Sequence, residues 1–322
     1  VNCLYSSRDV LWVGTETGGV NKISPRNSFV KIYTHQENMP GSISKNPVNS
    51  ILEDQDGNLW VGTVEGGLNL KKRGEKFFEH FTTTSSAHLS HNSVSALSID
   101  DKDRLWVGTW GNGVTLLDRK NPAKPASKYL NSSSEAGFLI DFVGALQYDK
   151  LNRGMWLGTN QGLYFYDLNT ETLKVPFGDQ SSNAISGIVG SAIDEKNQLW
   201  IGCAEGVYAI NLNRGSDNYF SYKHYKYKLD DPQSRLIDKI TCIYLDSKGI
   251  LWLGSDGFGL YKRIIDNQGE VSFKAYTMAD GLVSNNVKGI VEDDSGNLWI
   301  STNNGLSFLD RKNFQFSNLY KE

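Results

Sequence analysis

The sequence has 322 residues, a net charge of −3 and 39% hydrophobic residues. This near-neutral balance, without a basic run, argues against a nucleic acid or an anionic membrane surface as partner. No stretch approaches the roughly 20 apolar residues of a membrane span. The three cysteines include no Cys-x-x-Cys pair, so we predict neither a disulfide framework nor a zinc site from them.

One five-residue phrase organises the chain. Leu-Trp-Val-Gly-Thr stands at residues 11–15, 59–63 and 105–109, and degenerate copies follow at 155–159, 199–203, 251–255 and 298–302. Seven of the eight tryptophans belong to this phrase, at intervals of 44–52 residues. A period in this range indicates a solenoid or a propeller.

Each copy of the phrase has the same flanks. An apolar run and a polar turn precede it, as at 48–52 and 54–58, and a Gly-rich turn, a third run and an aromatic fourth run follow, as at 66–70 and 77–81. Short runs rich in β-branched and aromatic residues, bounded by Gly, Asn and Asp, are typical of strands and hairpins. Four such strands per repeat form a propeller blade. The sequence therefore predicts an all-β fold, a seven-bladed β-propeller with four antiparallel strands per blade.

The uniform period predicts a single domain over residues 1–322. We expect blades at about 1–46, 47–92, 93–140, 141–186, 187–238, 239–285 and 286–322. The chain begins inside a strand-like run, with a first strand expected at 1–5, so we expect it to be a fragment of a longer protein. Each repeat tryptophan is expected in the core, where it buries roughly 150–250 Å².

One position of the first strand is small in every blade. Cys3 and Cys242 align there with five other small residues, namely Ser50, Ala96, Ala145, Gly190 and Gly289. Crowding of the innermost strands explains this choice, so we assign the two cysteines to packing. Cys3 falls in the first blade and Cys242 in the sixth, which argues against a disulfide between them.

The strand order decides which loops share a face. With strands A to D counted from the axis outward, the A–B and C–D turns lie on one face, and the B–C turns and D–A crossovers on the other. The second set varies more, with crossovers expected at 35–47, 82–93, 131–141 and 229–238. Variable loops on a rigid scaffold commonly carry binding sites. We therefore expect a ligand on the face of the B–C turns.

Three further motifs accompany the phrase. Gly-Gly-Leu-Asn follows it at 66–69, Asp-x-x-Gly-x-Leu-Trp leads into it at 54–60 and 293–299, and Asp-Gly-Leu-Val-Ser-Asn-Asn-Val stands at 280–287. Together these residues resemble the two-component-regulator propeller repeat family, and the resemblance covers essentially the whole chain. In that family the propellers form the periplasmic sensor of membrane histidine kinases, most often hybrid two-component systems that control polysaccharide-utilisation genes.

The resemblance implies a non-enzymatic periplasmic sensor, the extracytoplasmic part of an inner-membrane protein. It would detect an oligosaccharide and pass the signal to a kinase domain elsewhere in the protein. The implied partners are the oligosaccharide, a second propeller, a β-sandwich and a second copy in a homodimer. No cofactor, nucleic acid or membrane contact is expected for this segment.

Two other function classes stay open, a propeller lyase or hydrolase and a pure protein-interaction scaffold. The acidic turn at 54–58 resembles part of a calcium loop, but it lacks the later glutamate. His88 and His91 have no assignable third ligand for zinc. We therefore predict no catalytic residue and no metal ligand.

Trp110 is the tryptophan outside the phrase, and it lies in a B–C turn. Two interpretations stay open, a ring that caps the blade edge and a stacking platform for a sugar ring. Phe258 has the same two interpretations, and polar side chains of equivalent turns would orient a ligand. The candidate ligand-binding residues are Glu65, Trp110, Asn112, Asn160, Gln161, Glu205, Asp256, Phe258, Asn303 and Asn304.

Overall fold

A computed structural model of the protein describes residues 1–7, 10–24, 29–135, 137–176, 185–217, 219–226 and 239–320. The chain has the fold of a seven-bladed β-propeller, with four antiparallel strands in each blade, as the repeat predicts. It divides into two compact units, Asn2–Gly187 and Ile188–Glu322 with Val1, and each is described by itself. The single-domain division and the blade boundaries stay predictions. The crossover expected at 229–238 lies outside the described residues.

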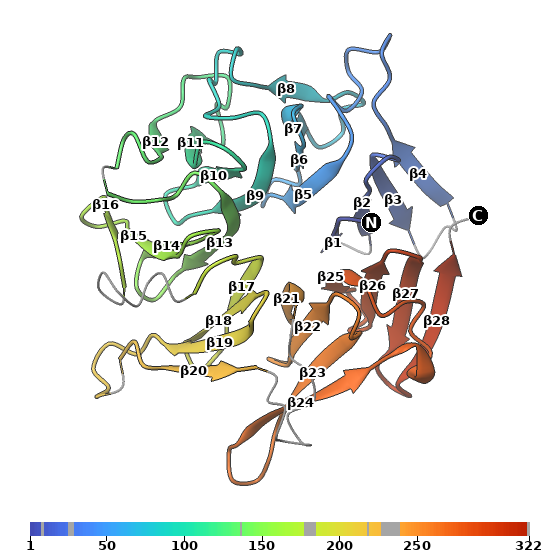
Figure 1. The fold of residues 1–322 in the computed structure, drawn as a ribbon. Helices are drawn as coiled ribbons and strands as arrows, with labels where there is room; N and C mark the ends of the chain where they lie inside the picture. The colour runs from blue at the N-terminus through green and yellow to red at the C-terminus, as the bar shows by residue number, and fades with distance from the viewer. Residues whose placement is uncertain are drawn as a thin grey trace. The chain divides into compact units, whose positions relative to one another are not determined.

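Four sheets make up the unit Asn2–Gly187, and each keeps its strands in chain order (Figure 1). The first two are β1 (Cys3–Ser7), β2 (Val10–Gly14), β3 (Val20–Ser24), β4 (Phe29–Tyr33) and β5 (Val48–Glu53), β6 (Leu59–Thr63), β7 (Gly67–Lys71), β8 (Glu79–Phe81). The next two are β9 (Val94–Ile99), β10 (Arg104–Thr109), β11 (Val114–Asp118), β12 (Lys128–Leu130) and β13 (Val143–Asp149), β14 (Gly154–Thr159), β15 (Leu163–Asp167), β16 (Thr172–Lys174). The first strand, expected at 1–5, thus begins two residues later.

Three sheets make up the unit Ile188–Glu322. They are β17 (Gly190–Ile193), β18 (Gln198–Cys203), β19 (Gly206–Asn211), β20 (Tyr222–Tyr225); β21 (Ile240–Leu245), β22 (Leu251–Ser255), β23 (Leu260–Ile265), β24 (Val271–Tyr276); and β25 (Val287–Glu292), β26 (Leu298–Thr302), β27 (Gly305–Asp310), β28 (Gln315–Tyr320). The short 3-10 helix η2 (Met278–Asp280) follows β24. No helix in the described part of the chain has the length and apolar character needed to cross a membrane.

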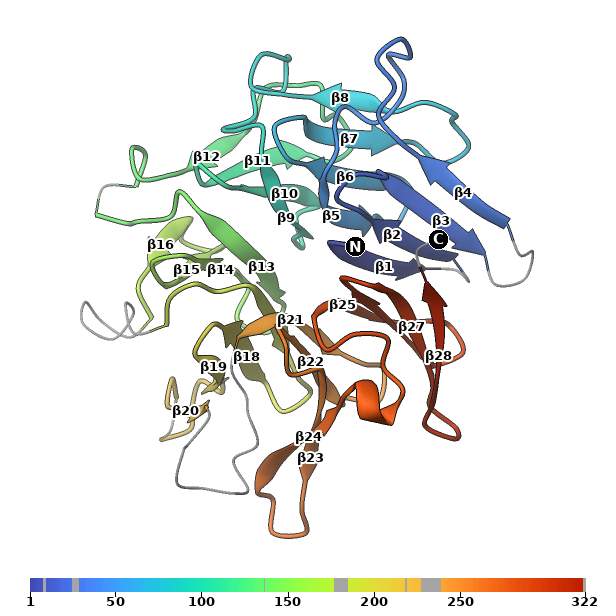
Figure 2. The same ribbon diagram turned by 45° about the vertical axis from the view of Figure 1, so that its right-hand side comes forward.

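Within each unit the core lies between successive sheets, whose first strands are neighbours, as with β5 and β9 (Figure 2). Trp60 packs with Leu105 and Val107 of the next sheet, while Leu59 and Val61 pack with Trp12 of the sheet before. Because successive strand residues point to opposite faces, the phrase places its tryptophan on one neighbour and its Leu and Val on the other. This arrangement explains why the phrase strands are buried on both faces.

The small first-strand position lies opposite the fourth residue of the phrase, which is a glycine in six sheets and Ser301 in the last. The register pairs Cys3 with Gly14, Ser50 with Gly62, Ala96 with Gly108, Ala145 with Gly158, Gly190 with Gly202, Cys242 with Gly254 and Gly289 with Ser301. A Cβ on Gly14 would lie 2.4 Å from the Cys3 sulfur, and one on Gly254 would lie 2.5 Å from that of Cys242. The two cysteines therefore pack, as predicted, and both are free thiols.

We expect these two thiols to resist alkylation in the folded protein. Desolvation by burial raises the pKa of Cys3 and Cys242 from 9.0 to about 12. Since the thiolate is the nucleophile, its fraction near pH 8 falls roughly a thousandfold for a shift of that size. Iodoacetamide labelling followed by mass spectrometry should modify both cysteines quickly only after unfolding in guanidinium. Equal rates in the native and unfolded protein would contradict their assignment to the packed interior.

The acidic A–B turns hold the repeat tryptophans. In six sheets the indole Nε1–H donates to the carboxylate of a turn aspartate over 2.8–3.3 Å, pairing Trp60 with Asp54, Trp106 with Asp100, Trp156 with Asp149, Trp200 with Asp194, Trp252 with Asp246 and Trp299 with Asp293. The other oxygen of most of these carboxylates accepts backbone N–H groups of the turn, as Asp54 does from Asp56 and Asn58. These aspartates thus satisfy the buried tryptophans. In the described residues, no three His, Cys, Asp or Glu side chains are placed to hold a metal ion.

Candidate functional site

The B–C turns have a uniform frame. The last residue of the phrase donates a side-chain hydrogen bond to the carbonyl of the glycine that begins the third strand or immediately precedes it, over 2.8–3.0 Å for Thr or Ser and 3.6 Å for Cys203. Gly19, Gly67, Gly113 and Gly259 have a positive φ near 70–90° there, which glycine adopts without strain. The side chains between hydroxyl and glycine take no part in this closing bond, and they differ from sheet to sheet.

Each B–C turn is also joined to the neighbouring crossovers by backbone hydrogen bonds. In the third sheet the N–H of Trp110 donates to the carbonyl of Ser93, and those of Gly111 and Gly113 donate to that of Asp141. In the sixth sheet Asp256 donates to Lys239 in the same way. Within each unit, turns and crossovers thus form a layer at the same ends of the strands, as the strand order predicts.

Two exposed aromatic side chains of this layer in the unit Asn2–Gly187 lie between β10 and β13. Trp110 and Phe142 form an isolated antiparallel bridge, and their side chains are 46% and 48% exposed. Leu139 in the same crossover is 54% exposed. Leu139 and Phe142 are thus exposed three residues apart, and the bridge places the exposed Trp110 opposite Phe142.

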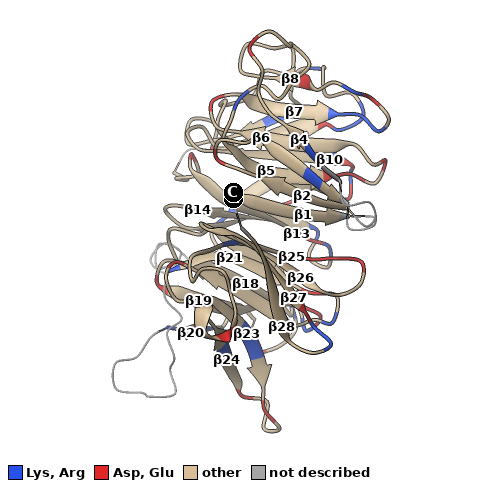
Figure 3. Ribbon diagram, turned by 90° about the vertical axis from the view of Figure 1, so that its right-hand side faces the viewer, with Lys and Arg blue, Asp and Glu red and all other residues tan. Residues whose placement is uncertain are grey.

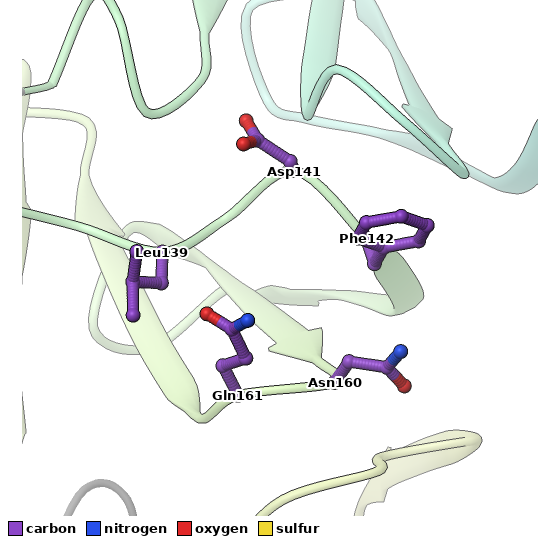
Figure 4. A pocket seen from close by; sticks show the side chains of 5 residues that line it. All are labelled: Leu139, Asp141, Phe142, Asn160 and Gln161. Atoms are coloured by element: carbon purple, nitrogen blue, oxygen red, sulfur yellow. The ribbon is translucent and has the colours of Figure 1, made fainter.

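A small pocket of about 80 Å³ adjoins this patch, lined by Leu139, Asp141, Phe142, Asn160 and Gln161 (Figure 4). Gln161 extends from the β14–β15 turn toward the crossover, and Asn160 lies below Phe142, to whose carbonyl its N–H donates over 3.1 Å. The Asp141 carboxylate accepts from the backbone and hydroxyl of Ser132. Exposed amides beside apolar surface suit a ligand rich in hydroxyl groups.

A second, more open hollow of about 510 Å³ lies at the β10–β11 turn, which also carries Trp110. Its lining includes His88, Asn112, Tyr129 and Asn131. The Asn112 amide donates to the carbonyl of Ser90 over 3.0 Å, and the Tyr129 hydroxyl donates to that of His88 over 2.6 Å. These bonds hold the hollow's wall in place, so Asn112 is a positioning residue as well as a lining one.

The remaining candidate residues lie elsewhere. Glu65, from the turn of the preceding sheet, is exposed and forms an ion pair with Lys45 at 3.4 Å. Phe258 is partly buried against the core of its own unit, which favours the packing interpretation for it. Four exposed candidates belong to the other unit, Ile188–Glu322, namely Glu205, Asp256, Asn303 and Asn304. The structure therefore brings together Trp110, Asn112, Asn160 and Gln161.

Sequence reasoning missed the crossover residues of this surface. Phe142 directly precedes a first strand, where Pro47, Ser93, Lys239 and Asn286 stand in other sheets. A comparison of that position across the repeats would have singled out its aromatic ring. Nothing in the repeat indicates Leu139 or Asp141, because the crossovers have no common length or register.

Four copies of the repeat match a known family model. The model of the two component regulator propeller matches residues 42–65, 88–111, 235–257 and 281–304. The chain carries two-component regulator propeller repeats. Each matched segment ends in a B–C turn, so the segment at 88–111 includes Trp110.

A curated relative contains the same kind of sequence. Histidine kinase P4 of Formosa agariphila is 26% identical over 233 residues, which are 56% of this chain and 16% of that protein. The chain with its two-component regulator propeller repeats thus spans about a sixth of the length of this relative.

Several solved structures share the fold. The extracellular domain of a candidate hybrid two-component system from B. thetaiotaomicron is 20% identical with a TM-score of 0.56, covering 100% of this chain and 46% of that one. PorZ, an essential surface component of the type-IX secretion system of Porphyromonas gingivalis, is 19% identical with a TM-score of 0.70, covering 95% and 46%. An ancestral GH74 enzyme is 15% identical with a TM-score of 0.69, covering 98% and 45%. At these identities the likeness shows the propeller fold, which both sensors and enzymes use.

Proposed function

We propose that this propeller is the periplasmic sensor part of a hybrid two-component histidine kinase and that it binds an oligosaccharide without turning it over. The proposal that the ligand is a saccharide rests on the surface around Trp110 and Phe142. Two exposed rings beside the amides of Asn160 and Gln161 offer stacking faces and hydrogen-bonding groups together, as a sugar requires. The repeat family and the histidine kinase relative support the signalling role.

The chemistry around the pocket favours binding over catalysis. Asp141, the one carboxylate among the described residues that line the pocket, accepts hydrogen bonds from two donors of Ser132. Glycoside hydrolysis commonly requires two carboxyl groups on either side of the scissile bond. In the proposed mechanism, a bound saccharide changes the packing of the propeller against the other domains or against a second copy, and the kinase responds.

We expect Trp110→Ala to weaken saccharide binding at least tenfold. Truncation of an aromatic residue at the centre of a contact usually costs more binding affinity than truncation of other contact residues. The measurement is calorimetric titration with a panel of neutral and acidic oligosaccharides, combined with chromatography of the incubated sugars. Phe77→Ala, which removes another exposed ring (59%) of the same unit, is the matched control.

The panel also separates the three function classes. Saturable binding without new products supports the sensor, and product formation supports a lyase or hydrolase. If no saccharide of the panel bound, or if Trp110→Ala and Phe77→Ala weakened binding equally, a saccharide site at this surface would be contradicted. Either result would favour a protein-interaction scaffold.

A further inference from the structure

The first sheet departs from the tryptophan–aspartate pairing. In the other six sheets the turn aspartate lies opposite the residue two places before the tryptophan. In the first sheet that register position is Ser7, which pairs with Val10. Trp12 is only 8% exposed, yet its indole nitrogen has no hydrogen-bond partner among the described residues. A buried donor without an acceptor costs roughly 1–3 kcal/mol.

A cation of the following sheet completes this pairing elsewhere. Arg119, after β11, reaches back to Asp54 of the second sheet at 3.0 Å. Arg263 and Arg311 reach Asp194 and Asp246 in the same way, each at 2.9 Å. The aspartate carboxylate in those sheets thus lies between an indole N–H and a guanidinium, and it accepts a hydrogen bond from the first and forms an ion pair with the second.

The same cation is present in the second sheet, but two of the three carboxylate positions around it hold other residues. Arg73 is the register equivalent of Arg119, since Leu70 pairs with Trp60 as Leu116 pairs with Trp106. Ser7 stands at the position equivalent to Asp54, the first partner of Arg119. Gly57 stands at the position equivalent to Asp103, the second partner. The counterpart of the third partner, Asp56, is Asp9 in the sequence, which lies outside the described residues.

A cavity of about 210 Å³ opens at this place. Its lining includes Trp12 and the cations Lys22, Lys71, Lys72 and Arg73, and Glu53 is the one acid among the described residues that line it. Lys72 is paired with Glu79 at 2.6 Å, and the Lys22 ammonium lies 5.4 Å from the centre of the Trp12 ring. Figure 3 shows charged residues of the protein mainly in loops at the strand ends, and here the charges are predominantly basic.

We propose that this cavity is an anion site that binds the carboxylate of a ligand, in the place that an aspartate fills in the other sheets. The Trp12 indole N–H and the Arg73 guanidinium are its donors, and Lys22 and Lys71 supply charge. The site lies at the A–B and C–D turns, at the opposite strand ends from Trp110, and goes beyond the proposed function.

The crowding of cations agrees with an anion site. Desolvation by burial, followed by repulsion from Lys31 and Lys22, lowers the pKa of Lys71. A bound carboxylate would relieve that repulsion. An arginine prefers a planar, two-oxygen partner, which a carboxylate supplies.

The test follows the indole N–H signal of Trp12 by nuclear magnetic resonance, assigned with Trp12→Phe, at constant ionic strength. Sodium glucuronate and an acetylated, amidated Asp tripeptide are the probes, and glucose is the neutral control. We expect saturable shifts of Trp12 with one or both acids and none with glucose. The tighter of the two identifies the source of the carboxylate as a small acid or an acidic protein segment.

Four variants make the result decisive. Ser7→Asp, which supplies an internal carboxylate, should weaken glucuronate or peptide binding at least tenfold and raise the melting temperature, whereas Ser7→Ala should change binding less than twofold. Arg73→Ala should weaken binding at least fivefold, and Lys76→Ala, a neighbouring exposed cation outside the cavity, should not. An unresponsive Trp12, equal effects of Arg73→Ala and Lys76→Ala, or binding that arises only in Asp9→Asn would overturn the proposal.

Discussion

Trp106→Ala is expected to lower the free energy of unfolding by about 3–5 kcal/mol, the usual cost of deleting a buried aromatic side chain. Trp106 is fully buried and packs edge-on against Tyr166 of the next sheet at 5.3 Å. The substitution also removes the donor to the buried carboxylate of Asp100, 2.8 Å away. Guanidinium denaturation, followed by circular dichroism, measures the loss.

Trp110→Ala is the matched control, four residues further along the same hairpin. Its side chain is 46% exposed, so the loss of stability should stay below about 1 kcal/mol. If Trp110→Ala unfolded as early as Trp106→Ala, the ring at 110 would be a structural cap, and the saccharide surface would lose its main residue.

Arg119→Ala is the second large expected effect, a loss of about 3 kcal/mol, because removal of one partner strands a buried charge. The Arg119 side chain is 1% exposed and bonds to Asp54, Asp56 and Asp103. It thereby joins the turns of two sheets. Arg73→Ala, its register equivalent, should cost less than about 0.5 kcal/mol, since Arg73 is exposed.

The pH dependence of the free energy of unfolding tests whether the Arg119 ion pairs cause this loss. Hydrogen bonds from Arg119 lower the pKa of Asp103 below 3.8. Burial alone raises the pKa of Asp54, but hydrogen bonds from Trp60, Asn58 and Arg119 lower it overall. Carboxylates with a depressed pKa stabilise the fold above the unfolded value and lose that effect as pH falls through the folded value. The difference between parent and Arg119→Ala should therefore be full at pH 7 and shrink below about pH 4. A constant difference down to pH 2 would contradict the ion-pair explanation.

The sequence was sufficient for the fold because one set of residues repeats seven times. The phrase determines which strand is buried on both faces, and the small position opposite its fourth residue was recognised from the alignment alone. The role of the turn aspartates was not recognised. A spacing of six residues between Asp54 and Trp60, repeated at Asp100 and Trp106, was visible in the sequence, but an indole–carboxylate bond is evident only once the hairpin is folded.

The candidate site was predictable only in part. Trp110 was singled out because it breaks the repeat, and its exposure agrees with a place on the binding face. Phe258 breaks the repeat as well, yet it packs partly on the core, and the sequence does not distinguish these outcomes. Phe142 lies 32 residues from Trp110 in a crossover of irregular length, so only the folded chain places the two rings together. The roles of all ten candidate residues in binding stay a proposal.

The hydroxyl-to-glycine bond of the B–C turns separates closure of the hairpin from what the hairpin displays. Thr109 and Gly113 close the turn with their own atoms, and Trp110, Gly111 and Asn112 take no part in that bond. The two or three residues between the hydroxyl residue and the glycine can therefore be exchanged without removing the bond that closes the turn. Gene duplication copies the frame, and drift within these residues then gives each blade a different surface without disturbing the strands. The same property makes these turns natural positions for a combinatorial library on this scaffold.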